Sequence, residues 1–294
     1  MRIKMLVPAV LAAAALALTG CAGGGGGGNT TAAPTIAPDA AAVALLPDAI
    51  KTAGVLNMGV DATYPPNEYK DEAGNPIGWD VELADAVAAK LGLKSSWTVA
   101  AFANIIPSVV GDKVNMGVSS FTDNAEREQQ VNFVNYYQAG ILWASPAGKT
   151  VNPDDACGLK VAVQATTYQH TDEVPAKSDA CVAAGKAAIE IVPFDTQDAA
   201  TSAVVLGQVD AMSADSPVTA YAIAQSKGKL QAAGSSFDVA PYGYALSKTA
   251  GLDKAIQAAL QSLIDDGTYM AILDKWGVGE GAIKVATING ASAS

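Results

Sequence analysis

The sequence predicts an α/β protein of two lobes, because a rhythm of strands and helices runs along the chain twice. The first series covers residues 55–118, and a second series starts after Gly148 and ends near residue 225. Short apolar runs that alternate with helical patterns are typical of units with parallel strands. Two more helical segments, residues 252–266 and 268–276, follow without strands between them. We expect these two helices to pack back on the first lobe.

The first series has the order strand, helix, strand, helix, strand. Residues 55–60 form a short apolar run, and residues 80–91 carry apolar side chains at helical spacing. Gly92 follows at the position where a helix C-cap favours glycine. The series is completed by a strand at 96–100, a helix at 103–110 that Gly111 stops, and a strand at 114–118.

The second series repeats this alternation with a more polar first helix. It begins with a strand at 160–164 and ends with a helix at 217–225, which has a proline in its first turn. Between them we expect a polar helical stretch, a strand at 188–194, a helix at 198–206 and a strand at 210–214.

The N-terminus has the features of a bacterial lipoprotein signal. Arg2 and Lys4 precede an apolar run at 5–18 that is too short to span a bilayer, and small residues come directly before Cys21. We expect residues 1–20 to be a cleaved signal peptide and Cys21 to carry a lipid. The exported protein would then be anchored at the outer face of the cytoplasmic membrane. An ordinary secretory signal is the alternative, and it would leave Cys21 as an unpaired thiol.

Residues 21–46 predict a flexible tether between the anchor and the lobes. An unbroken hexaglycine follows the cysteine, and the remainder is mostly Ala, Thr and Pro with little to bury. The hexaglycine lacks the flanking strand and helix of a phosphate-binding loop, as does the glycine-rich stretch at 277–281. We therefore expect no nucleotide site and no cofactor.

Charge and cysteine content narrow the possible partners further. The formal net charge is −11 at pH 7, so nucleic acid is not an expected partner. Cys157 and Cys181 form an even pair in an exported chain, which predicts a disulfide. A metal site at these cysteines lacks ligands, because His170 is the only histidine in the sequence.

An exported, tethered protein of two α/β lobes is suited to capture a small ligand where loops at strand ends meet. Several local stretches make this function more specific: GVDATYPPNEY (59–69), GWDVELA (78–84), FANIIP (102–107), VSSFTDNAER (118–127), VAVQATT (161–167), GQVDA (207–211), DSP (215–217), PYGY (241–244) and DGTYMAILDKW (266–276). In order and spacing, the chain from about residue 50 to residue 285 resembles the family 3 extracellular solute-binding proteins. These proteins are the receptors of polar amino-acid ABC importers.

The resemblance implies a type II periplasmic-binding-protein fold, in which a two-strand hinge joins the lobes and a ligand cleft lies between them. It places lobe 1 at residues 47–145 and 240–285, lobe 2 at 146–239, and a C-terminal tail at 286–294. The two hinge strands are expected to cross between the lobes near residues 144–148 and 237–241.

The resemblance also implies how the α-carboxylate of an amino acid is bound. Arg127 offers a planar fork of donors that matches a carboxylate in two-point contact. Thr122 can donate a hydroxyl and a backbone N–H to the same group, and Thr167 can add its own from the start of a second-lobe helix. Thr166 belongs to the same loop and is included in the site. Without the resemblance, Arg127 is a solvated arginine at a helix start and the threonines are caps or turn residues.

Asp215 supplies the charge that an α-ammonium requires. It is expected to accept a hydrogen bond from the ammonium together with the carbonyl of Ser120. Because Asp215 precedes Ser-Pro, an N-cap of the next helix is the alternative role.

The side-chain end of the pocket is assigned by resemblance to Asp61, Tyr64 and Phe102, with Ser119 and Tyr168 nearby. Two aromatic rings that flank a cationic group, with a carboxylate beyond them, would suit arginine, lysine or ornithine, with glutamine next. The alternative for Tyr64 and Phe102 is a role as ordinary rim or core aromatics.

Two positions depart from the family pattern. Asn67 stands where these proteins usually have phenylalanine, and Ala165 replaces the usual glycine before Thr166. Ala165 restricts the backbone near the ligand, whereas Asn67 is either a lost apolar contact or a new polar ligand contact. Both departures affect the expected identity of the substrate more than the fold.

An enzyme on the same fold is the competing class. A dehydratase similar to cyclohexadienyl dehydratase needs a general acid or base in the cleft, and Glu68 is the unassigned carboxylate near the opening loop. A sensor ectodomain would need a membrane helix after the lobes, whereas residues 283–294 are small, polar and short. We therefore expect a monomeric binding protein without catalytic residues, which traps a free amino acid by hinge closure and delivers it to an ABC permease in the cytoplasmic membrane.

Overall fold

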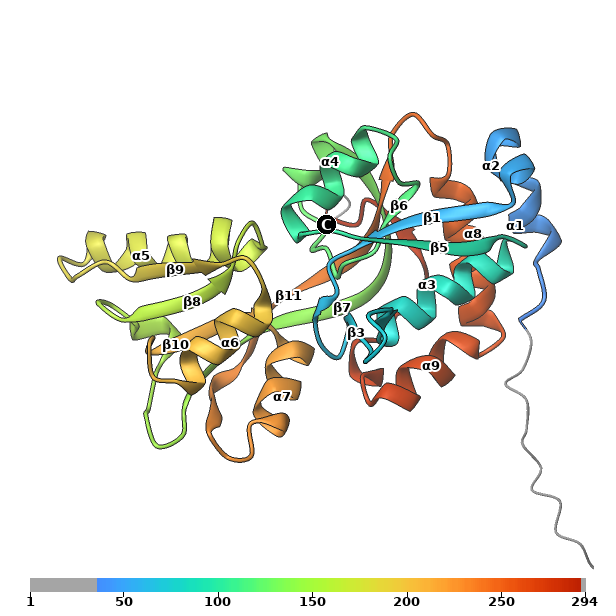
Figure 1. Cartoon of the computed structure of the whole chain (residues 1–294). Helices are drawn as coiled ribbons and strands as arrows, with labels where there is room; N and C mark the ends of the chain where they lie inside the picture. The colour runs from blue at the N-terminus through green and yellow to red at the C-terminus, as the bar shows by residue number, and fades with distance from the viewer. Residues whose placement is uncertain (1–35, 292–294) are drawn as a thin grey trace, which may run out of the picture. The chain divides into compact units, whose positions relative to one another are not determined.

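The computed structural model describes residues 36–291 of the chain (Figure 1). The expected signal peptide, the lipidation site Cys21 and the hexaglycine lie outside these residues, so the lipid anchor stays a prediction. Within residues 36–291, no helix combines the length and the apolar character needed to cross a membrane.

A mixed sheet runs through the described part of the chain. Its strand order is β5-β1-β6-β11-β7-β10-β8-β9, and β12 pairs with β7 beside this path. The strands are β1 (Val55–Val60), β5 (Lys94–Val99), β6 (Met116–Gly117), β7 (Val131–Pro146), β8 (Lys160–Gln164), β9 (Glu190–Phe194), β10 (Ala211–Asp215), β11 (Leu230–Ser247) and β12 (Thr287–Ile288). β1 pairs in parallel with β5 and β6, and β8 pairs in parallel with β9 and β10, so each βα series forms its own parallel set.

Helices cover each parallel set and make it a lobe (Figure 1). In the first lobe these are α1 (Ala40–Ala44), α2 (Asp48–Ala53), α3 (Trp79–Lys90), α4 (Ile105–Val110), α8 (Asp253–Asp265) and α9 (Thr268–Trp276). In the second lobe they are α5 (Val174–Ala183), α6 (Gln197–Val205) and α7 (Ser216–Gln225). The first lobe also carries a small antiparallel sheet of β2 (Thr63–Tyr64), β3 (Glu68–Lys70) and β4 (Pro76–Ile77).

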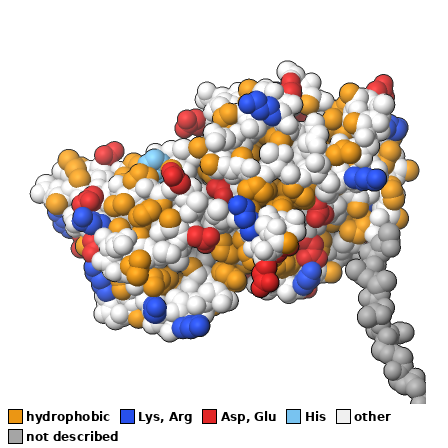
Figure 2. All heavy atoms as spheres, in the orientation of Figure 1, with side chains coloured by type: hydrophobic (Ala, Val, Ile, Leu, Met, Phe, Trp, Pro, Cys, Tyr) orange, Lys and Arg blue, Asp and Glu red, His pale blue; other side chains and the backbone are white. Residues whose placement is uncertain are grey.

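Charged side chains are dispersed over the surface. Figure 2 shows them singly or in small groups among hydrophobic and neutral side chains on one face. Some join helices of the first lobe: Lys275 of α9 lies 2.7 Å from Glu82 of α3, and Lys90 of α3 lies 2.6 Å from Asp266 after α8. An exposed pair such as Lys275–Glu82 contributes about 0–1 kcal/mol, so the fold depends mainly on its apolar cores.

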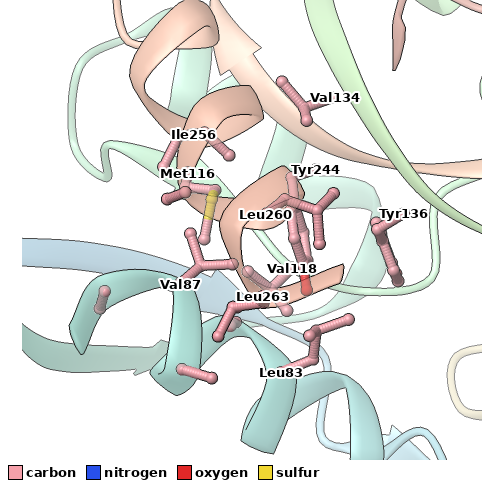
Figure 3. Close-up of a cluster of buried hydrophobic side chains, with 14 of the residues drawn as sticks. Leu83, Val87, Met116, Val118, Val134, Tyr136, Tyr244, Ile256, Leu260 and Leu263 are labelled. Atoms are coloured by element: carbon pink, nitrogen blue, oxygen red, sulfur yellow. The ribbon is translucent and has the colours of Figure 1, made fainter. Parts of the chain in front are cut away.

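The core of the first lobe joins the chain's early and late segments. Leu83 and Val87 of α3 lie one helical turn apart, and Figure 3 shows them close to Leu260 and Leu263 of α8. All four side chains are fully buried. Burial of each stabilises the lobe by about 1.5–3 kcal/mol. This packing confirms that the last helices return to the first lobe.

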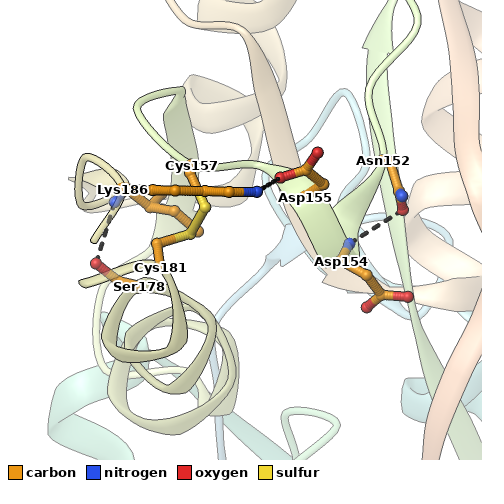
Figure 4. The surroundings of a disulfide bond; sticks show 8 residues. Asn152, Asp154, Asp155, Cys157, Ser178, Cys181 and Lys186 are labelled. Carbon is orange, nitrogen blue, oxygen red and sulfur yellow. Dashed lines mark hydrogen bonds and ion pairs between the residues drawn. A yellow bond between two sulfur atoms is a disulfide. The ribbon is translucent and has the colours of Figure 1, made fainter. Parts of the chain in front are cut away.

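The second lobe has its own core, and the predicted disulfide lies at its edge. Cys157 and Cys181 are bonded, with their Cα atoms 5.5 Å apart (Figure 4). The bond ties the segment before β8 to α5. An ion pair of 2.7 Å between Lys186 and Asp155 lies beside it (Figure 4).

The two long strands β7 and β11 pass from one core to the other. Ala139 of β7 packs in the first core and Ile141 in the second, opposite Phe237 of β11. A Cβ on Gly140, between them, would lie 2.9 Å from the carbonyl oxygen of Phe237 and closer still to the hydroxyl of Ser236. The two strands therefore approach each other at a distance that only glycine permits.

Most of the predicted elements are confirmed. The strands at 55–60 and 160–164 and the helix at 268–276 have the predicted bounds, and most of the others differ by one or two residues. The helix expected at 103–110 begins with a 3₁₀ turn, Phe102–Asn104, and the polar helical stretch of the second lobe begins as a π-helical segment, Gln169–Glu173.

Three boundaries are corrected by the structure. The tether was expected to reach residue 46, but α1 is already folded, because Asp39 caps it and Ala42 and Leu46 are buried in the first core. Residues 141–144 of β7 already pair with β10 of the second lobe, so β7 enters that lobe before the expected crossing at 144–148. The tail expected at 286–294 is not loose throughout, since β12 pairs with β7 within it.

Candidate functional site

The carboxyl ends of strands from both lobes meet at one pocket. Asp61 follows β1, Ser119 and Ser120 follow β6, Gln164 ends β8 and Asp215 ends β10. Ten of the eleven predicted ligand residues line this pocket: Asp61, Tyr64, Phe102, Ser119, Ser120, Thr122, Arg127, Thr167, Tyr168 and Asp215. Glu68, Gln164 and Gln169, which were not predicted as ligand residues, complete the lining.

Arg127 presents a guanidinium group to the pocket without a carboxylate partner. Its Nη1 donates to the carbonyl of Thr122 at 2.9 Å, and its Nη2 donates to the carbonyl of Thr166 at 3.1 Å. The rings of Phe102 and Phe121 lie 5.6 and 5.8 Å from its central carbon. Among the described residues, Arg127 forms no ion pair. The group is held in place by neutral contacts, and its charge remains available to an anion.

Thr166 is the predicted site residue that does not line the pocket. It is exposed, with a φ of 64°, and its N–H donates to Nδ1 of His170 at 3.0 Å. Its carbonyl, rather than its side chain, contacts Arg127. The left-handed backbone therefore occurs at Thr166 and not at Ala165, so alanine at position 165 fits without strain.

The other two predicted threonines are engaged locally. The hydroxyl of Thr167 donates to the carbonyl of Gln164 at 2.7 Å, which closes the turn that leads into the second-lobe helix. Thr122 offers its carbonyl to Arg127 and forms an isolated β-bridge with Tyr242. The hydroxyl hydrogen of Thr167 is thus already in use, which leaves its oxygen as an acceptor.

Asp215 is buried and faces the pocket rather than the helix behind it. Its carboxylate accepts hydrogen bonds from Tyr64 at 2.9 Å, Tyr242 at 2.7 Å and Gln169 at 2.7 Å. Although Asp215 stands at the N-cap position of α7, its side chain makes no capping hydrogen bond. Burial raises its pKa. The alternative role as an N-cap is therefore wrong for the side chain.

Asp61 is a second buried carboxylate of the pocket. Its carboxylate accepts from the hydroxyl of Thr63 at 2.8 Å, the backbone N–H of Phe102 at 3.0 Å and the side-chain amide of Gln164 at 2.8 Å. Gln164 belongs to the second lobe, so this last bond links the lobes across the pocket. Burial raises the pKa of Asp61, and the hydrogen bonds partly oppose this effect.

Asn67 lies behind the pocket wall. Its side chain is fully buried, donates to the hydroxyl of Ser120 at 2.9 Å and accepts from the indole N–H of Trp79 at 2.8 Å. Where a phenylalanine was the family expectation, this residue therefore connects the core tryptophan to a pocket serine. The possibility that Asn67 contacts the ligand is not supported by this geometry.

The pocket carries more carboxyl groups than cations. Asp61, Asp215 and Glu68 line it together with Arg127. A ligand that has one carboxylate and two cationic groups would satisfy Arg127 and offset the acidic excess. Within the described residues, no cluster of three or more His, Cys, Asp or Glu could hold a metal ion.

Comparison with known proteins agrees with this geometry. Residues 56–279 match the family model of the bacterial extracellular solute-binding proteins, family 3. The arginine-binding protein ArgT of Corynebacterium glutamicum is 40% identical over 248 residues, which cover 84% of this chain and 82% of that protein. The lysine/arginine/ornithine-binding periplasmic protein of Escherichia coli is 28% identical over 249 residues, covering 81% and 90% of the two chains.

Solved structures show the same fold. An ancestral arginine-binding protein bound to arginine has a TM-score of 0.69 and 31% identity, and covers 76% of this chain and 98% of its own. An ancestral amino acid-binding protein, a precursor of cyclohexadienyl dehydratase, has a TM-score of 0.67 and 31% identity, with 78% and 98% covered.

Proposed function

Because this chain belongs to the family 3 bacterial extracellular solute-binding proteins, we propose that it captures a basic amino acid, arginine foremost, for an ABC importer. The observation that carries the proposal is the charge arrangement of the pocket. Arg127 has no carboxylate partner among residues 36–291 and shares the pocket with two buried aspartates, Asp61 and Asp215. An amino acid with a cationic side chain has the three charges that these groups would bind.

The proposed pose follows from the available atoms. The α-carboxylate would lie against the guanidinium of Arg127, and the α-ammonium against Asp215 and the carbonyl of Ser120. The side chain would extend past Tyr64 and Phe102, so that its cationic end reaches Asp61. The names of the relatives favour arginine, whereas the pocket chemistry alone also fits lysine and ornithine.

Capture would use closure of the lobes on the strands β7 and β11. Contacts between the lobes already join Asp61 to Gln164, Tyr64 to Asp215, and Arg127 to the carbonyl of Thr166. A ligand that contacts both lobes would bind the closed form more tightly and shift the population toward it. We place the lobe boundaries at the two strand crossings, near Gly140 and between Phe237 and Tyr242, a revision of the boundaries inferred from the sequence.

Location and partners complete the proposal. We propose a monomer anchored by a lipid on Cys21 at the outer face of the cytoplasmic membrane, where it meets its permease. Replacement of Cys21 by serine in the full-length chain should release the protein from membranes. Retention of the variant on membranes would contradict the lipid anchor.

We propose a binding protein and no catalytic role. The relatives described above are binding proteins by name. Glu68, the carboxyl that a dehydratase reading would use, accepts hydrogen bonds from the neighbouring Ser119 and Ser120. These hydrogen bonds account for the position of Glu68 in the pocket wall without a catalytic role.

Calorimetric titration tests the function directly. The secreted chain with Cys21→Ser would be unfolded and refolded to remove bound ligand, then titrated with the twenty amino acids, ornithine and citrulline. Saturable binding of arginine, with an affinity near micromolar or about 8 kcal/mol, is expected. Binding of glutamine alone would make Asp61 a hydrogen-bond acceptor rather than a charge partner. The absence of binding to every amino acid would overturn the proposal.

A further inference from the structure

Two carboxyl groups lie together beneath the ligand pocket. Glu68 is in β3 and lines the pocket, whereas Asp80 is in the first turn of α3, behind it. Both residues are 0% exposed. Neither forms an ion pair with any lysine or arginine of the described chain. Buried charges without partners destabilise the folded state, so two ionised groups in this place would be strongly unfavourable.

The two carboxyl groups hold the loop that forms the pocket floor. Glu68 accepts from the hydroxyl of Ser120 at 3.0 Å and, at the longer distance of 3.4 Å, from that of Ser119. Asp80 accepts from the backbone N–H of Ser120 at 3.2 Å and from the hydroxyl of Tyr136 at 2.7 Å. Ser120 has a φ of 48°, which a non-glycine residue adopts only when its surroundings hold it there.

Two polar atoms of this cluster lack a hydrogen-bond partner. Oδ1 of Asp80 is buried and accepts no hydrogen bond from the described residues, and the buried hydroxyl of Tyr244, which faces Asp80, forms none either. A buried oxygen in this state lowers the stability of the folded protein. A proton on Glu68 would give Asp80 a further donor beside the phenol of Tyr244, because a protonated carboxyl group donates one hydrogen bond and still accepts others.

The surroundings favour a proton over a second negative charge. The carboxylates of Asp61 and Asp215 act on Glu68 from the pocket side, and both disfavour its ionisation. On the helix side, the phenols of Tyr136 and Tyr244 face Asp80. These phenols are neutral, since burial raises their pKa values further above the usual one.

We propose that Glu68 and Asp80 share one proton, that the pair acts as a positioning unit for Ser119 and Ser120, and that cationic amino acids displace part of this proton when they bind. The release step rests on the proposed function, whereas the shared proton does not. The proton dissociates from the carboxyl pair and passes to solvent buffer, which leaves the pair with a second negative charge opposite the ligand's α-ammonium.

The raised pKa values of Asp80 and Glu68 support the proposal independently of the hydrogen bonds around Asp80. Burial raises the pKa of Asp80 to about 7, and burial with the adjacent Asp80 charge raises the pKa of Glu68 well above its usual value. The pair therefore retains a proton at neutral pH. A positive charge near it favours the ionised form and lowers its proton affinity, so binding of a cation and release of a proton are linked.

Infrared spectroscopy tests the shared proton without any ligand. The mature chain with Glu173→Gln, which removes another buried glutamate whose pKa burial raises to about 7, should show at pH 7 the carbonyl band of a buried, protonated carboxylic acid, and the further substitution Glu68→Gln should remove this band. Glutamine keeps the shape of glutamic acid, and its oxygen can still accept from one of the two serines, which donate to different oxygens of Glu68. If Glu68→Gln does not fold, Asp80→Asn, a change outside the pocket lining, should also remove the band. A spectrum of the Glu173→Gln chain without such a band would overturn the proposal.

Calorimetry in phosphate and in Tris, which differ in ionisation enthalpy, tests the release. At pH 7 to 8, the heat of arginine binding should differ between the two buffers. The difference should correspond to the net release of less than one proton per bound arginine. At saturating arginine, Glu68→Gln should show equal heats in both buffers. Glu72→Gln, a change of an exposed glutamate in the same small-sheet region, should leave the release unchanged.

The outcomes separate this inference from the proposed function. Normal arginine binding with heats that do not depend on the buffer would overturn proton release and leave the function intact. Persistent release in Glu68→Gln would assign the proton to another group and overturn the pair. Failure of the wild-type protein to bind any amino acid would contradict the function, while the infrared band would still decide whether the proton is shared.

Discussion

Tyr64 and Asp215 lie 151 residues apart in sequence and are joined by two hydrogen bonds across the pocket. The phenol of Tyr64 donates to the Asp215 carboxylate at 2.9 Å and accepts from the Asp215 backbone N–H at 3.1 Å. One residue follows β1 in the first lobe and the other ends β10 in the second. The pair therefore couples the position of the lobes to the orientation of the carboxylate proposed to bind the α-ammonium.

Tyr64→Phe should weaken binding of arginine roughly tenfold, because a hydrogen bond to a charged group contributes about 1.5–3 kcal/mol and part of this is replaced by water. Calorimetric titration measures the change. Tyr69→Phe, in the same small sheet but outside the pocket lining, serves as the matched control. Equal affinities of wild type and Tyr64→Phe would show that this contact does not support the bound state.

Arg127→Ala should reduce binding at least a hundredfold without loss of the fold, since it removes the cation that would pair with the ligand's carboxylate. Arg127→Lys should recover only part of the affinity, because an ammonium group cannot form the same two-point contact. Titration together with circular dichroism separates binding from folding. Normal binding by the alanine variant would show that the carboxylate assignment is wrong.

Asp61→Asn should change specificity more than overall affinity. The substitution removes a charge but keeps an oxygen that can accept from Gln164, so arginine should lose about tenfold to a hundredfold and glutamine much less. The ratio of the two dissociation constants is the measurement. An unchanged ratio would exclude Asp61 as the partner of the cationic side chain.

Removal of the disulfide by a double substitution, Cys157→Ala with Cys181→Ala, should lower the free energy of unfolding by about 2–4 kcal/mol. The bond constrains the segment before β8 and α5, neither of which contributes a residue to the pocket lining. Denaturant unfolding measures the loss, and the folded variant should still bind arginine in the cold. Equal stability of the two proteins would contradict this role of the bond.

Stability should depend on pH through Glu173, which is buried in the second lobe and accepts from Trp143 at 3.1 Å and from Ser213 at 2.8 Å. Burial raises its pKa to about 7, above the value near 4.3 of an unfolded chain. The folded state thus binds the proton more tightly, and its stabilising effect is lost as the pH rises from about 4.5 through 7.

Glu173→Gln should remove this part of the pH dependence, roughly 1–3 kcal/mol between pH 4.5 and 8. The free energy of unfolding of both proteins, measured by denaturant across this range, gives the comparison. Glu190→Gln, at an exposed position of β9, provides a control that should keep the slope of the wild type. Parallel pH profiles for the wild type and Glu173→Gln would contradict the assignment.

Local patterns predicted much of the fold because strands and helices here are bounded by glycines and carry clear periodicity. The two longest strands, β7 and β11, were expected only as short hinge crossings implied by the resemblance, and their length was not predicted. β7 has no turn signal near its crossing except Gly140, and its role there depends on the approach of Ser236 from a distant segment. The helix α1 was missed because its alanines have the composition of a tether, and only Asp39 and contact with α8 distinguish it.

The sequence motifs identified most of the residues that line the pocket, but not the contacts between them. Gln164 acquires its place through a hydrogen bond to Asp61, 103 residues away, and Gln169 through a bond to Asp215. Asn67 looked like a pocket residue because its neighbours are, yet the indole of Trp79 holds it in the wall. The positions of these three side chains depend on contacts between distant segments. They cannot be predicted from the local spacing of residues.

The course of the chain through the two strand crossings makes the second lobe a single insertion within the first. Everything between Gly140 and Phe237 leaves the first lobe once and returns once, and α8, α9 and β12 then finish the first lobe. A recombination event with two breakpoints could therefore replace the whole second lobe, and with it Gln164, Gln169 and Asp215. The first lobe would keep Arg127 and Asp61. Relatives in this family could acquire new ligand preferences by such an exchange. The core of the first lobe, which the N-terminal and C-terminal segments form together, would stay unchanged.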